Sequence, residues 1–162
     1  MNAVRRLFDL MPKILGGLST TLLFLVMATV FMQVVFRYVL GLAVPWTEEV
    51  ARYFNVWMVF MGCAVAVARE GHIRITFMIQ RLHGAVRDVL LIALYAVMAG
   101  FEVIVFLGAI RLTQLNWNQQ ATTLPVTVST LYIALIVSAL LSFLFITVLF
   151  GRKLTAVVGR RT

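Results

Sequence analysis

Several of the side chains that could do chemistry lie in one short stretch. Residues 45–52 read PWTEEVAR and hold two carboxylates, a guanidinium and a tryptophan. Thr47 can cap a helix that begins with Glu48 and Glu49 near the positive end of its dipole, and Glu48 can pair with Arg52 one turn later. The stretch therefore predicts either an interfacial helix start with a surface ion pair or a set of polar contacts for a partner.

Glu102 is an acid inside an otherwise apolar segment. An ionised carboxylate in hydrocarbon costs about 2.5–3.5 kcal/mol on insertion scales, so we expect Glu102 to be paired or protonated. It could belong to a proton or cation site, but no second acid lies deep in another apolar segment to share a transported ion. We therefore favour a structural role, in which this acid holds helices together.

No catalytic residue, metal site or cofactor is predicted. His72 and His83 flank a short segment instead of facing each other across apolar helices, as axial haem ligands would. The single Cys63 excludes an internal disulfide and a cysteine-based metal site within this sequence. The net charge of +8 does not indicate nucleic-acid binding, because the arginines are dispersed between apolar runs with no recognition motif.

Four apolar segments must position these polar groups. The sequence is 62% hydrophobic and 12% charged, with a mean hydropathy of +1.01, which is typical of a membrane protein. A helix of about 20 residues crosses a hydrocarbon core about 30 Å thick. We expect an all-α integral membrane protein, a single domain over 1–162, with four transmembrane helices at about 14–36, 47–68, 89–110 and 126–150.

The distribution of Lys and Arg predicts the orientation in the membrane. With both termini in the cytoplasm, eleven of the 14 Lys and Arg residues lie on the inner side, and only Arg37, Arg52 and Arg111 lie outside. This is the bias that the positive-inside rule describes. The first apolar segment is too long for a typical signal-peptide core and has no small-residue cleavage site after it, so we expect an uncleaved span.

One face of the second predicted helix changes in character along its length. It is polar at the outer end, small in the middle and basic at the inner end. Steps of three and four residues connect its members, which are Glu48, Arg52, Asn55, Val59, Gly62, Ala66 and Arg69. Helices in lipid associate through small residues and interhelical hydrogen bonds, so this face predicts a seam for another helix of this chain or of a partner.

The region around this seam resembles the signature region of the small membrane subunit of TRAP transporters, the tripartite ATP-independent periplasmic transporters. The matching residues are Arg37-Tyr38, Trp46-Thr47-Glu48-Glu49, Arg52-Tyr53, Gly62 and Arg69-Glu70-Gly71-His72-Ile73, in that order. The four-span layout agrees, and Thr123–Pro125 is similar to the start of the family's fourth helix. The family often has Pro or Gly inside that helix, whereas this sequence has neither there.

The resemblance implies a non-enzymatic subunit in the bacterial inner membrane, surrounded by lipid. It would bind a large multi-span permease subunit that carries the substrate and sodium sites, and a periplasmic solute-binding protein would deliver organic acids. The small subunit would act as a static scaffold. The residues that would face the large subunit are Arg37, Trp46, Glu48, Glu49, Arg52, Asn55, Gly62, Ala66 and Arg69, and those with structural polar roles are Glu70, Gly71, His72 and Glu102.

Two other classes stay open from the residues themselves. One is a membrane anchor of a redox enzyme, which would show the visible absorption of haem when purified. The other is a small homo-oligomeric exporter, which would transport without any partner.

The segment after the second helix predicts a short interfacial helix. Gly71 can end the second helix because glycine adopts a positive φ at little steric cost. Residues 73–82 would then lie along the inner membrane surface, with Ile75, Met78, Ile79 and Leu82 facing lipid or the partner.

The charge distribution yields a direct test of topology. Reporter fusions after Arg81 and after Arg161 should report the cytoplasm, and a fusion near Asn118 should report the periplasm, because positively charged loops remain inside. A periplasmic signal at Arg81 would contradict the four-span arrangement.

Overall fold

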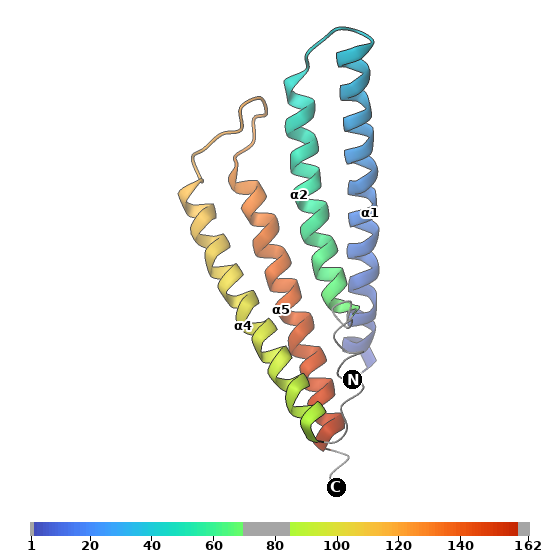
Figure 1. The fold of residues 1–162 in the computed structure, drawn as a ribbon, viewed down its shortest axis with the longest axis vertical. Coiled ribbons are helices and arrows are strands. Elements are labelled where there is room, and N and C mark those ends of the chain that lie inside the picture. Colours follow the sequence, from blue (N-terminus) through green and yellow to red (C-terminus); the bar gives the residue numbers. More distant parts are fainter. Residues whose placement is uncertain (1, 70–84, 159–162) are drawn as a thin grey trace.

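The computed structural model describes the backbone of residues 2–69 and 85–158 and the side chains of residues 8, 10–69, 86 and 89–151. Its helices, in chain order, are α1 Asn2–Tyr38, α2 Pro45–Ala68, α4 Ala85–Leu115 and α5 Ser129–Val158 (Figure 1). Each contains a stretch long and apolar enough to cross a membrane: Leu10–Tyr38, Pro45–Ala68, Val89–Leu115 and Ser129–Gly151. The predicted all-helical class with four such helices is confirmed. The apolar stretches differ from the predicted ranges by at most five residues at an end, while α1 begins earlier, at Asn2, and α5 ends later, at Val158.

The helices lie in the order α1, α2, α5, α4 (Figure 1). Within the described residues, α2 packs between α1 and α5, and α4 packs on α5. The first turn of α1 and the last turn of α5 lie at the same end of the molecule, which we call the terminal end. The α1–α2 and α4–α5 connections lie at the opposite end, the loop end. Each helix therefore runs antiparallel to the one it follows.

The start of α2 differs from the sequence prediction. The helix begins at Pro45, where a fixed φ and a missing N–H suit the first turn, and the preceding Val44 provides no side-chain cap. Thr47 is not the capping residue, and that prediction is wrong. It lies inside the first turn, is fully buried, and its hydroxyl donates to the Val44 carbonyl over 2.7 Å. Gly41, with φ of 66°, turns the chain between α1 and α2.

Small residues and hydroxyl groups hold α2 against both of its neighbours. On α5, the buried residues Ala134, Ser138 and Ser142 recur every four positions and place small side chains along one part of the helix. The Ser138 hydroxyl donates to the carbonyl of Phe60 over 2.7 Å. On the other side, the Ser19 hydroxyl of α1 donates to the carbonyl of Met58 over 3.1 Å. Both sides of α2 thus use the interactions that lipid favours between helices.

Apolar packing completes the core near the terminal end. Val67 of α2 packs with Phe145 and Ile146 of α5, and all three are buried. Phe8 of α1 meets Phe145 edge to face, with ring centroids 5.8 Å apart. The predicted helix end at Gly71 and the predicted interfacial helix over residues 73–82 lie outside the described residues.

Candidate functional site

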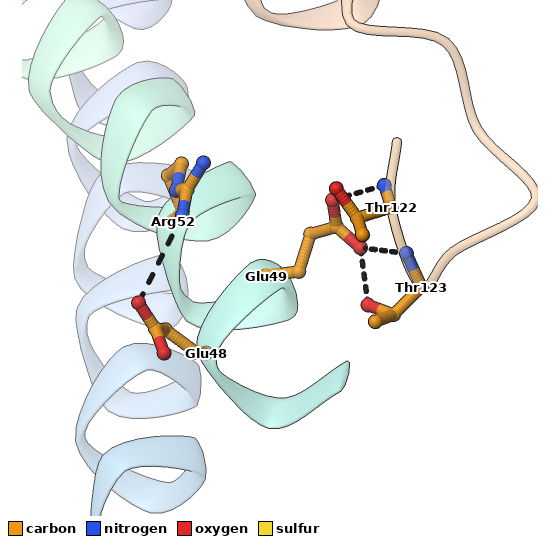
Figure 2. Close-up of polar contacts among 5 residues, drawn as sticks. All are labelled: Glu48, Glu49, Arg52, Thr122 and Thr123. Atoms are coloured by element: carbon orange, nitrogen blue, oxygen red, sulfur yellow. Dashed lines mark hydrogen bonds and ion pairs between the residues drawn. The ribbon is translucent and has the colours of Figure 1, made fainter. Parts of the chain in front are cut away.

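The first two turns of α2 place their charged side chains on two different faces. Figure 2 shows Glu48 and Arg52 together on one side of the helix and Glu49 on another, directed at the α4–α5 loop. The Arg52 Nη2 atom lies 3.8 Å from Glu48 Oε1, which confirms the predicted pair. These side chains are 62% and 69% exposed, and exposed ion pairs contribute little to stability. The pair is therefore available for contact with another molecule.

The Glu49 carboxylate binds the backbone of the α4–α5 loop (Figure 2). Its Oε1 accepts the N–H of Thr122 over 2.9 Å, and its Oε2 accepts the N–H groups of Thr123 over 2.7 Å and Leu124 over 3.0 Å. The Thr123 hydroxyl also donates to Oε2. Successive N–H groups that converge on one carboxylate form an anion-binding concavity, so Glu49 fastens this loop to the start of α2.

The same loop has further internal order. Gln120 and Thr127 form an isolated antiparallel bridge, and the N–H of Ala121 donates to the Val126 carbonyl over 2.9 Å. The Tyr53 hydroxyl of α2 donates to the Thr127 carbonyl over 3.3 Å. The buried Ser129 hydroxyl reaches the Asn116 carbonyl over 2.7 Å, across the loop base. These contacts fix the conformation of the loop at the loop end of the molecule.

A line of exposed residues continues from Glu48 and Arg52 toward the terminal end. We call it the α2 stripe; it comprises Glu48, Arg52, Asn55, Val59, Cys63 and Ala66, at steps of three and four. The buried residues of α2 lie on its other faces and are Thr47, Glu49, Tyr53, Met61, Ala64 and Val67. The structure thus brings five of the expected seam residues into one uncovered line and adds Cys63.

Three residues expected at the partner interface have contacts within this chain. Glu49 is only 9% exposed and is occupied by the loop. A Cβ added to Gly62 would lie 3.5 Å from the Ser19 Oγ of α1, so Gly62 faces α1 and not the stripe. Arg69 is exposed, and its guanidinium lies over Gly16 of α1. Arg37 and Trp46 are exposed at the loop end, as a partner contact requires.

Glu102 lines an apolar groove instead of meeting a charged partner. The groove holds about 560 Å³ between α2, α4 and α5, with Phe60, Met98 and Phe101 among its walls. Within the described residues, Glu102 forms no hydrogen bond or ion pair. It also lines a smaller pocket of about 170 Å³ on the side of Phe106 and Phe143. Its helix-joining role, expected from the sequence, therefore stays a prediction.

The remaining expected polar residues are Glu70, Gly71 and His72, and they lie outside the described residues. Among the side chains that are described, no group of three His, Cys, Asp or Glu residues could hold a metal ion.

The loop residues that bind Glu49 were not predicted from the sequence. Thr122 and Thr123 follow α4 and precede Pro125, and this Thr-Thr-Leu-Pro run was the available signal. It was compatible with any polar loop, because its partner Glu49 lies more than seventy residues earlier in the chain.

Comparisons with known proteins agree with this architecture. The family described as "Tripartite ATP-independent periplasmic transporters, DctQ component" matches residues 26–156. A putative TRAP transporter small permease protein of Haemophilus influenzae is 27% identical over 136 residues, which cover 84% of this chain and 82% of that protein. A second protein of that description from the same organism is 32% identical over 79 residues, or 49% of each chain. The sialic acid TRAP transporter small permease protein SiaQ of Vibrio cholerae is 28% identical over 109 residues, which cover 67% of this chain and 61% of that protein.

Removing the Glu49 carboxylate should loosen the loop that it binds. In Glu49→Ala, the amides of residues 122–124 should exchange with deuterium at least about tenfold faster, because they lose charge-assisted hydrogen bonds. Glu49→Gln, which keeps one acceptor oxygen, should be intermediate. Glu48→Ala is the matched control and should leave these amides protected. Unchanged exchange in Glu49→Ala would show that other contacts hold the loop.

Proposed function

This chain belongs to the DctQ family of tripartite ATP-independent periplasmic transporters, and from that premise we propose that it is the non-catalytic small permease subunit of a sodium-coupled uptake system for organic acids. The system lies in the bacterial inner membrane. A large multi-span subunit carries the solute and sodium sites, and a periplasmic binding protein delivers the solute. The name of the Vibrio cholerae relative, which specifies sialic acid, supports an organic acid as the solute class.

The role that we propose for this chain is to hold the large subunit in place. The supporting observation is the uncovered α2 stripe: α1 covers one side of α2 and α5 another, while the stripe residues stay exposed. The stripe is charged at the loop end and small at Ala66, which combines polar contacts with close helix approach. Glu48 and Arg52 can exchange their weak mutual pair for contacts across the interface.

The Glu49 contacts support a static scaffold. They fasten the α4–α5 loop to the first turn of α2, the turn at which the stripe begins on another face of the helix. Glu49 does this from a different face of α2 than the one that carries Glu48 and Arg52 (Figure 2). A surface that is ordered before binding loses less entropy on association. This favours a subunit whose loop end does not rearrange during transport.

Bulk introduced on the stripe should weaken assembly. In Val59→Trp and Ala66→Trp, overpacking of a tight helix interface should cost about 1–3 kcal/mol, which is about a ten- to hundredfold loss of association. The measurement is co-purification of the large subunit from detergent, together with sodium-dependent solute uptake by cells. Gly62 is unsuitable for this test because it faces α1.

Ile104→Trp on α4 is the matched control, since Ile104 is 70% exposed and lies away from α2. It should leave co-purification and uptake unchanged. The docking assignment fails if both stripe variants assemble normally while the Ile104 variant does not. Uptake that persists without the large subunit or without a sodium gradient would contradict the proposed transport role itself.

A further inference from the structure

The terminal end contains a cleft that is separate from the groove and the pocket beside Glu102, on the opposite end of the molecule from the Glu49 contacts. It holds about 600 Å³ between α1, α2 and α5, within the range of about 300–1,000 Å³ that is typical of ligand sites. Its apolar walls include Phe8, Phe145, Val148 and Leu149. Lys13 of α1 and Arg69 at the end of α2 also line it.

The two cations of this cleft converge on one turn of α1. Arg69 Nη2 lies 3.7 Å from the position of a Cβ added to Gly16, and Gly16 is three residues after Lys13, on the same face of the helix. Lys13 and Arg69 are both exposed. Among the described side chains, neither one forms a hydrogen bond or an ion pair. The paired positive charges are therefore not neutralised by any described acid.

The depth of the cleft in the molecule matches the boundary between lipid tails and headgroups. Lys13 lies three residues inside the apolar stretch that begins at Leu10, and Arg69 follows directly after the stretch that ends at Ala68. The apolar walls then continue from these cations along α5 into the membrane-spanning part. This arrangement offers two cations at headgroup level and hydrocarbon contact below them.

We propose that this cleft binds an anionic phospholipid, with the phosphate between Lys13 and Arg69 and an acyl chain along Phe145 and Val148. Basic pockets between transmembrane helices are suited to such headgroups. The wider charge balance agrees: on the predicted topology, the eleven inner Lys and Arg residues are accompanied by only three acids, Asp9, Glu70 and Asp88. A soluble anion would gain nothing from the apolar walls. The site is separate from the α2 stripe and does not depend on the solute that is transported.

The test is lipid retention by the full-length chain in nanodiscs that contain equal amounts of phosphatidylglycerol and phosphatidylethanolamine. Native mass spectrometry should show phosphatidylglycerol enriched on the wild-type chain. Lys13→Gln and Arg69→Gln should each lower the enrichment about fivefold, and the double variant about thirtyfold. Lys13→Arg with Arg69→Lys preserves both charges and should retain it. Gly16→Leu keeps both cations but displaces the guanidinium, and it should also lower the enrichment.

The matched control is Arg37→Gln with Arg111→Gln, which removes the same charge at the loop end and should leave the enrichment unchanged. The proposal is overturned if the wild-type chain shows no preference between the two lipids. It is also overturned if the control pair lowers the enrichment as much as the site pair. A site pair that weakens co-purification of the large subunit without altering lipid retention would show that these cations contact protein instead.

Discussion

Helices in a bilayer gain no hydrophobic free energy by meeting each other, because lipid tails are as apolar as their side chains. The contacts of α2 follow from this constraint. Ser19 and Ser138 donate to α2 carbonyls from α1 and α5, and the small residue Gly62 lies at the contact with α1. The bulky apolar residues of α2 are left for the membrane or for the core near the terminal end. Within the described residues, α2 is thereby the helix that joins α1 to the α4–α5 pair.

Two adjacent carboxylates have different roles at the loop end. Glu49 is directed inward and orders the α4–α5 loop through backbone N–H groups, whereas Glu48 stays at the surface with Arg52. One residue of offset on a helix rotates a side chain by about 100°, which is enough to separate a structural acid from a contact acid. The proposed scaffold role depends on this division, since a partner can meet Glu48 and Arg52 without disturbing the loop. The lipid cleft at the terminal end is independent of it.

The sequence predicted what depends on local pattern. Apolar run length defined the four helices, and a spacing of four predicted the Glu48–Arg52 pair, because both properties are local to a helix. The Thr47 cap was wrong since Pro45 offered a better first turn. The hydrogen-bond partners of Glu49 could not be predicted, because they are distant in the sequence and because the adjacent Glu48 is also a carboxylate. Helix spacing placed Gly62 on the predicted partner face of α2. Gly62 is, however, rotated about 40° from Glu48 around the helix axis, and this brings it against α1. The contact of Ser138 with α2 had a local signal, because Ala134, Ser138 and Ser142 are small residues repeated every four positions.

Site-specific photo-crosslinking tests most directly whether the α2 stripe contacts the large subunit, because it reports proximity between the two chains and replaces only one side chain. A photoreactive amino acid would be placed at Asn55 on the stripe, and at Ile104 on α4 as the comparison, in cells that produce the complete transporter. The account predicts a crosslinked product of this chain and the large subunit from Asn55 and none from Ile104. A product from Ile104 in the absence of one from Asn55 would contradict it.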